Sequence, residues 1–184
     1  MHLYRRFISI ALVLSIAIFS ITAGGADEKP AVSTDKPNEV VFGENWLASW
    51  NFEDDAIRFT LVAPTTGWVG IGFNPSRMMK DADYILAYVA DGEVFIRDDF
   101  GNGLTSHVSD ISLGGTQTVE VIEGSEANGI TTVTFRLPKS SGDAFDVVFN
   151  PGQRYKIIAA YGSNGFDNFT GMHKARKSIE VTLE

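Results

Sequence analysis

The chain has 184 residues, 44% of them hydrophobic, and a formal net charge of −8 at pH 7. This length suits one well-packed domain and is short for two. The acidic balance argues against nucleic acid as a partner, because affinity for nucleic acid comes largely from Lys and Arg side chains that meet phosphates. The absence of cysteine excludes disulfide bonds, thiolate zinc sites, iron–sulfur clusters, a cysteine nucleophile and haem attached through cysteine.

The N-terminal segment has the composition of an export signal. Arg5 and Arg6 precede an apolar stretch at 7–21, and small residues follow up to Ala26. We expect residues 1–26 to be a cleaved signal peptide. The alternative is a retained anchor, because the apolar stretch approaches the lower end of the ~17–25 residues that span a bilayer. The predicted location is periplasmic or extracellular, with a membrane tether if the segment is retained.

The next segment, residues 27–39, is expected to be a flexible tether. Pro30 and Pro37 lie there among Ser, Thr, Lys and Asp, a composition that buries little apolar surface. Cleavage near Ala26 would remove Arg5 and Arg6 and change the net charge from −8 to −10. We expect a single domain over residues 40–184.

The domain region shows the two-residue period of half-buried strands. Ile57, Phe59 and Leu61 alternate with other side chains in a run that turn residues bound on both sides. Further runs rich in β-branched and aromatic residues lie at 68–73, 84–89, 94–97, 118–122, 131–137, 155–161 and 178–183.

The turns between these runs complete the prediction of fold. Asp91-Gly92 and Asn128-Gly129 are dipeptides typical of tight β-hairpins. No segment after residue 26 has a sustained helical period. Many short strands without helical crossovers predict an all-β fold, specifically an antiparallel immunoglobulin-like β-sandwich.

One stretch carries a family resemblance. Residues 66–75 read TGWVGIGFNP, and they are followed by Met79, by Asp81-Ala82-Asp83 and by an apolar run at 84–89. This resembles the core of a DOMON domain, in which a strand reading G-W-x-x-[IL]-G-F enters a loop with a methionine, then an acidic residue and another strand. The resemblance covers roughly residues 41–184 and is weakest at 99–116.

The resemblance implies the haem b-binding cytochrome type of this family, similar to the cytochrome domain of cellobiose dehydrogenase. Such members use a methionine of this loop and a histidine near the C-terminus as axial ligands of the haem iron. By position these are Met79 and His173, with Met78 and Lys174 as alternatives. The two ligands can converge on a sandwich if both loops emerge near one end of the sheets.

The chemistry of this ligand pair indicates electron transfer. A neutral imidazole and a thioether raise the reduction potential of haem, and two filled axial positions leave no place for oxygen or substrate. We therefore expect an electron-transfer protein and not an enzyme, whose partner is a redox protein or a membrane-bound electron carrier. The expected aromatic walls come from Trp68, Phe73, Phe166 and Phe169. The cationic residues near both ligands, Arg77, Lys80, Lys174 and Arg176, are candidates to pair with haem propionates.

Two other functions remain open at this point. The first is a haem-free module of the same fold that binds a sugar or another small ligand. The second is a Cu(I) site, because thioether and imidazole ligands suit that ion. Its ligands would be Met78, Met79, Met172 and His173.

Several polar residues are interpreted as ordinary surface groups. His107 lies among serines in the weakly matching region and is expected at the surface, with the alternative that it is the second ligand in place of His173. A set of acidic and amide residues lacks the spacing of an EF-hand, and we interpret its members as solvated turn residues. They are Asp81, Asp83, Asp98, Asp99 and Asn102.

Overall fold

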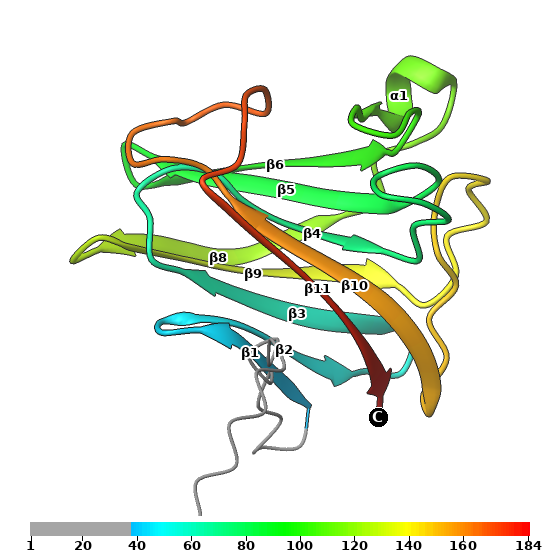
Figure 1. The fold of residues 1–184 in the computed structure, drawn as a ribbon. Helices are drawn as coiled ribbons and strands as arrows, with labels where there is room; N and C mark the ends of the chain where they lie inside the picture. Colours follow the sequence, from blue (N-terminus) through cyan, green and yellow to red (C-terminus); the bar gives the residue numbers. More distant parts are fainter. Residues whose placement is uncertain (1–37) are drawn as a thin grey trace, which may run out of the picture. The chain divides into compact units, whose positions relative to one another are not determined.

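The structure is a computed structural model that describes residues 38–184. The predicted signal peptide and all but the last two residues of the predicted tether lie outside the described residues. Residues 38–184 form two antiparallel sheets packed as a sandwich (Figure 1). In this part of the chain, no helix has the length and apolar character needed to cross a membrane.

The first sheet has five strands in the order β1-β2-β3-β9-β8. Its strands are β1 (Glu39–Gly43), β2 (Trp46–Phe52), β3 (Ala56–Ala63), β8 (Glu120–Ala127) and β9 (Ile130–Pro138). Asn128 and Gly129 join β8 to β9 with φ angles of 55° and 77°. Both angles are positive, which is the conformation that a tight hairpin turn requires.

The second sheet has six strands in the order β11-β10-β4-β5-β6-β7. Its strands are β4 (Val69–Phe73), β5 (Asp83–Ala90), β6 (Glu93–Phe100), β7 (Val108–Ser109), β10 (Gln153–Tyr161) and β11 (Ala175–Leu183). The one helix of the described residues, α1 (Asp110–Leu113), follows β7 and ends at Gly114, whose φ is 91°.

The core lies between the two sheets and is mostly aromatic and aliphatic. At its centre Phe59 of β3 packs against Phe73 of β4, Phe135 of β9 and Phe149 of the loop before β10. All four rings are buried. The expected all-β, antiparallel sandwich is confirmed.

Strand β4 is buried on both of its faces, and this property positions the site. Val69, Ile71 and Phe73 point into the sandwich core, whereas Gly70 and Gly72 alternate with them and face outward. All five residues of the strand are nevertheless buried. The outer face of the six-stranded sheet at β4 is therefore covered by side chains and loops of this same domain.

Candidate functional site

A second apolar cluster lies on the outer face of the six-stranded sheet. Its buried members are Trp68, Ala82, Tyr84 and Leu86, and its partly buried members are Met79, Tyr88, Ala160 and Phe169. We call these eight residues the outer-face cluster. They come from β5, from β10, from the residue before β4, from the loop between β4 and β5, and from the loop between β10 and β11. This cluster is separate from the core between the sheets.

Glycines make room for the rings of this cluster. Gly72 pairs with Tyr84, and a Cβ atom on Gly72 would lie 2.2 Å from Tyr84 Cε1. A Cβ atom on Gly162 would lie 2.4 Å from Trp68 Nε1. Both distances are far below a van der Waals contact, so the two rings reach the sheet surface only because the side chains beneath them are absent. Of these two glycines, only Gly72 belongs to the spaced glycines of residues 67–72 that the sequence shows.

Met79 belongs to the loop between β4 and β5 and packs on the outer-face cluster. The loop is held by three backbone hydrogen bonds, which run from Met79 N to Leu104 O (3.2 Å), from Asp81 N to Gly101 O (2.7 Å) and from Gly101 N to Ala82 O (2.8 Å). The neighbouring Met78 has a φ of 55° and is 50% exposed. Of the two methionines, Met79 is the one that packs on the cluster.

His173 belongs to the loop between β10 and β11, residues 162–174. This loop adjoins the start of β4, because Trp68 N donates to Phe166 O (3.1 Å) and Gly162 N donates to Trp68 O (2.8 Å). Phe169 of the same loop packs on the outer-face cluster, with its ring centroid 5.0 Å from that of Tyr88.

The loop with Met79 follows the end of β4, whereas the 162–174 loop lies beside the start of β4. The two loops are therefore at opposite ends of this strand. The condition stated for their convergence, that both loops emerge near one end of the sheets, is therefore not met. Figure 1 shows the 162–174 loop, in orange, far from the end of β4 that leads to Met79. Both loops instead border the outer-face cluster, the first through Phe169 and the second through Met79.

The imidazole of His173 is half-buried and has its Nε2 3.1 Å from Nη1 of Arg176. An arginine only donates hydrogen bonds, so we assign Nε2 as the acceptor and place the ring proton on Nδ1. Nε2 thus carries the lone pair that can bind a metal, and a metal ligated there would displace the hydrogen bond from Arg176. Within residues 38–184, Arg176 forms no ion pair with a carboxylate, so its charge is available to an anionic group.

Two hydrogen-bond donors in the outer-face cluster have no acceptor. Trp68 Nε1 and the Tyr84 hydroxyl are buried and unpaired in the structure. Burial also raises the pKa of Tyr84 well above its usual value, so the hydroxyl stays protonated. A buried donor without an acceptor costs about 1–3 kcal/mol, and such a group is a point at which a polar ligand atom is stabilising.

Arg97 and His107 border the same cluster and share one carboxylate. Arg97 donates from Nε (2.5 Å) and Nη2 (2.6 Å) to Asp99, and its guanidinium lies 4.7 Å from the Phe169 ring centroid. His107 Nδ1 is hydrogen-bonded to the same carboxylate, and the His107 ring lies 5.9 Å from that of Tyr84. Burial alone would raise the pKa of Asp99, but the bonds from His107 and Arg97 outweigh burial and leave this pKa lowered.

These observations change the interpretation of several residues. His107 is not an ordinary surface residue, since its side chain is only 19% exposed and is paired. Asp83, Asp98 and Asp99 are not solvated turn residues, since each is at most 3% exposed. Phe73, expected to line the cofactor site, points into the core on the opposite face of the sheet and is not part of the outer-face cluster.

The donor set of the outer face fits a haem that is held without a covalent bond. It offers a thioether at Met79, an imidazole nitrogen at His173 whose lone pair accepts from Arg176, and a cation at Arg176 itself. It also offers apolar rings and two unpaired donors at Trp68 and Tyr84. Lys174 is exposed, and its backbone N donates to Tyr161 O (2.8 Å).

Comparison with known sequences identifies related proteins. The model of the DOMON domain family matches residues 43–162. DBH-like monooxygenase protein 1 of Mus musculus is 32% identical over 94 residues, which are 50% of this chain and 14% of that protein. DBH-like monooxygenase protein 2 of Mus musculus is 28% identical over 136 residues, which are 71% of this chain and 21% of that protein. The chain thus matches about a fifth or less of the length of these relatives.

Comparison with solved structures gives two cytochrome domains. The cytochrome b domain of pyranose dehydrogenase from Coprinopsis cinerea superposes with a TM-score of 0.56 at 14% identity, over 74% of this chain and 75% of that one. The cytochrome domain of Myriococcum thermophilum cellobiose dehydrogenase gives 0.54 at 10% identity, over 83% and 80% of the two chains. At these identities the likeness is one of fold.

Proposed function

The chain belongs to the DOMON domain family, and from this premise we propose that its sandwich is a b-type cytochrome that transfers single electrons. The proposal rests on one observation. Met79 and the loop that carries His173 border the same apolar cluster on the outer face of one sheet. A haem bound there would supply one-electron chemistry, with Met79 and His173 as its axial ligands.

The residues around the site would each have a definite task. Trp68, Tyr84 and Leu86 exclude water from one side of the site, which favours binding of a flat apolar group. Arg176 is placed to pair with a propionate by a charge-assisted hydrogen bond. Phe169 packs on the cluster in the structure, and it would have to move aside to admit a ligand of this size.

Export and separate partners are part of the same proposal. We propose that the electrons come from and go to a redox protein or a membrane-bound carrier outside the cytoplasm. The protein would turn over no substrate, because both axial positions of the iron would be filled. The monooxygenase activity named for the curated relatives is not proposed for this chain, since the matched part is 14% and 21% of their length.

A haem-free binding module is the second candidate, and one observation favours it. Phe169 already closes the outer-face cluster, and Arg97 lies over its ring, so the face is well packed by the chain's own side chains. A ligand smaller than haem, such as a sugar, would disturb this packing less.

Visible spectra of the full chain with added haem distinguish the two candidates. We expect the wild type to bind one haem and to give a sharp low-spin spectrum when reduced. Met79→Ala and His173→Ala should each lose this spectrum, because a low-spin b-type haem needs both strong axial ligands. Met172→Ala and Lys174→Ala are the controls and should keep it, since Met172 is 84% exposed and Lys174 is also exposed.

Other outcomes would change the account. If Met78→Ala loses the spectrum and Met79→Ala keeps it, the methionine ligand is Met78 and not Met79. A wild type that stays colourless with added haem would contradict the cytochrome proposal. The fluorescence of the tryptophans, titrated with monosaccharides and disaccharides, would then test the binding module.

A further inference from the structure

Four carboxylates meet at one end of the sandwich, two of them on the face of the six-stranded sheet opposite to the outer-face cluster. Asp83 begins β5, Asp98 lies in β6, Asp110 begins α1, and Asp146 lies in the loop between β9 and β10. We call these four residues the acidic cluster. In Figure 1 the end of β6, α1 and the loop at 139–152 lie together at this end of the sheets.

Three of these side chains are close enough to share one ion. One carboxylate oxygen from each of Asp98, Asp110 and Asp146 lies within 4.8 Å of the other two. Asp98 and Asp110 are 2% and 1% exposed, and Asp83 beside them is 3% exposed. Asp98 pairs with Ile85, a residue of the core, and paired residues of neighbouring strands point to the same face of the sheet, so Asp98 points inward. Asp83 lies two residues before Ile85 on the same strand and therefore also points inward.

The carboxylate oxygens of the acidic cluster lack hydrogen-bond donors. Oδ1 of Asp83, Asp98 and Asp146 and both oxygens of Asp110 are buried and unpaired. Buried polar groups in folded proteins are almost always paired, so five unpaired oxygens in one place require an explanation. A bound cation would pair with the unpaired oxygens of Asp98, Asp110 and Asp146.

Hydrogen-bond donors near the acidic cluster pair with the Oδ2 atoms of three aspartates and leave their Oδ1 atoms unpaired. Thr118 Oγ1 donates to Asp98 Oδ2 and to Asp146 Oδ2, both at 2.9 Å, and Thr118 N donates to Asp98 Oδ2 at 3.1 Å. Val147 N donates to Asp83 Oδ2 at 2.9 Å. These hydrogen bonds therefore hold the carboxylates of Asp83, Asp98 and Asp146 in place, and each keeps one unpaired oxygen.

The neighbouring charges that act most strongly on Asp83, Asp98 and Asp110 are those of other aspartates. Burial, and then the charges of Asp146 and Asp99, raise the pKa of Asp98 to about 7. Burial, and then the charges of Asp98 and Asp146, raise the pKa of Asp110 to about 8. Carboxylates buried together are costly to ionise unless a positive charge accompanies them.

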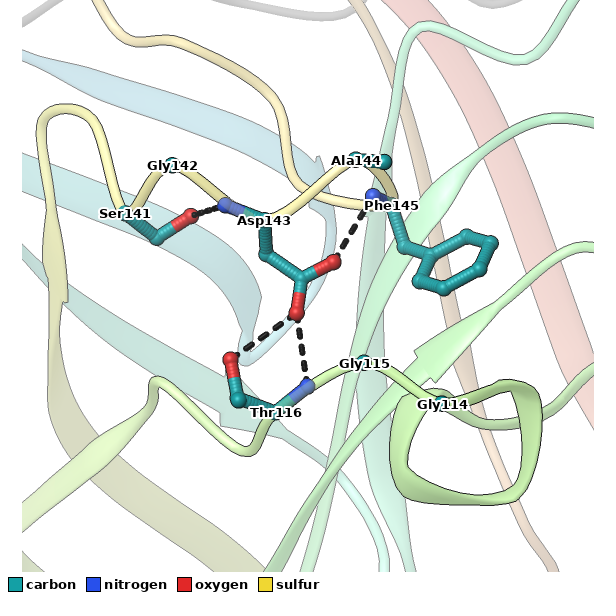
Figure 2. A pocket seen from close by; sticks show the side chains of 8 residues that line it. All are labelled: Gly114, Gly115, Thr116, Ser141, Gly142, Asp143, Ala144 and Phe145. Carbon is teal, nitrogen blue, oxygen red and sulfur yellow. Dashed lines mark hydrogen bonds between the residues drawn. The ribbon is translucent and has the colours of Figure 1, made fainter.

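A neighbouring depression shows how the segments that carry the acidic cluster are joined. It has a volume of about 350 Å³ and lies between residues 114–116, just after α1, and residues 141–145, just before Asp146. Figure 2 shows Asp143 extending from one segment to the other, where it accepts hydrogen bonds from Thr116 N (2.6 Å) and Thr116 Oγ1 (2.8 Å). Phe145 N donates to the same carboxylate at 3.0 Å, so both oxygens of Asp143 are already paired. Asp143 thus holds the two segments together and is not a candidate ligand.

We propose that Asp98, Asp110 and Asp146, with Asp83 beside them, bind one Ca²⁺ ion. Ca²⁺ takes six to eight oxygen ligands and binds carboxylates in one- or two-oxygen modes, which suits Asp110 with both oxygens free. A site of carboxylate oxygens without nitrogen or sulfur selects against Zn²⁺ and copper. The ion would tie β5, β6, α1 and the loop between β9 and β10 to one another, and it would do so whether or not haem is bound.

The test uses the full chain, treated with EDTA and then dialysed, without added haem. We expect CaCl₂ to raise Tm by several degrees, MgCl₂ at the same concentration to raise it less, and calorimetric titration to give one Ca²⁺ per chain. Asp110→Asn removes a charge but no hydrogen bond that the structure contains. Without calcium, its Tm should equal or exceed that of the EDTA-treated wild type, and its Ca²⁺ affinity should fall at least about tenfold.

Asp54→Asn is the matched control, because Asp54 lies exposed in the turn between β2 and β3 and the change of charge is the same. It should leave the Ca²⁺ affinity and the Tm shift unchanged. The proposal is overturned if the wild type does not bind Ca²⁺, or if Asp110→Asn keeps the full Tm shift. A shift with MgCl₂ as large as that with CaCl₂ would overturn the choice of calcium.

Discussion

Phe59→Ala is expected to lower the free energy of unfolding by about 3–5 kcal/mol, the range for removing a fully buried aromatic ring. Phe59 is 0% exposed and lies at the centre of the core, where its ring centroid is 5.2 Å from Phe73 and 5.8 Å from both Phe135 and Phe149. The contact with Phe73 crosses to the other sheet, and the contact with Phe149 reaches the loop before β10. The substitution therefore opens a cavity that no neighbouring strand can fill.

Urea denaturation of the wild type and the variant measures this loss. Phe166→Ala is the control, since Phe166 is also a phenylalanine but is 50% exposed and lies in the 162–174 loop. We expect Phe166→Ala to cost less than about 1 kcal/mol. Equal losses for the two variants would contradict the assignment of Phe59 to the centre of the core.

Gly101→Ala is expected to lower stability by about 1–3 kcal/mol and to weaken haem binding as well. A Cβ atom on Gly101 would lie 1.9 Å from the backbone oxygen of Met79 and 3.1 Å from the backbone N of Ala82. Because these are backbone atoms, no side-chain rotation relieves the clash. The Met79 loop would have to move, and its hydrogen bonds between Asp81 N and Gly101 O and between Gly101 N and Ala82 O would lengthen or break.

Thermal unfolding and haem titration of the same variant separate the two effects. Gly43→Ala is the control, because the nearest atom to its added Cβ would be Trp46 Cε3 at 3.9 Å, an ordinary contact. We expect Gly43→Ala to change neither Tm nor haem affinity appreciably. If Gly101→Ala keeps wild-type stability, the close packing of residue 101 against the Met79 loop is wrong.

Much of the fold could be predicted from the sequence because its signals are local. The alternation of Ile57, Phe59 and Leu61 predicts β3, since residues that alternate along a strand share one face. The Asp91-Gly92 hairpin is confirmed, with φ angles of 52° and 81° at the turn. These features depend on the backbone preferences of a few neighbouring residues.

Other strands were missed or misplaced where the local signal is weak. Strand β2 buries Trp46, Ala48 and Trp50, but small and polar residues between and beside them obscure the period. Strand β8 spans residues 120–127, whereas the pattern predicts 118–122. It lies at the edge of its sheet and nearly all of its residues are exposed, so the burial that creates the period is absent.

The candidate sites depend on tertiary contacts that no local pattern encodes. Aspartate is common in exposed turns, so nothing near Asp98 or Asp110 in the sequence indicates that they are buried together. The contact between Phe169 and the outer-face cluster joins segments that lie far apart in the sequence. A local signal did exist for Gly72 under Tyr84, since it belongs to the GWVGIG pattern that carries the family resemblance, but Gly162 under Trp68 lies far from that pattern in the sequence.

Carbon monoxide binding to the reduced, haem-loaded full chain tests the central claim most directly. Carbon monoxide binds reduced haem iron at an open axial position, so two filled positions should prevent the reaction. We predict that the reduced spectrum of the wild type stays unchanged under carbon monoxide, and that Met79→Ala acquires the spectrum of a carbon monoxide complex. Immediate binding by the wild type, or failure of the wild type to take up haem at all, would contradict an electron-transfer role with Met79 and His173 as ligands.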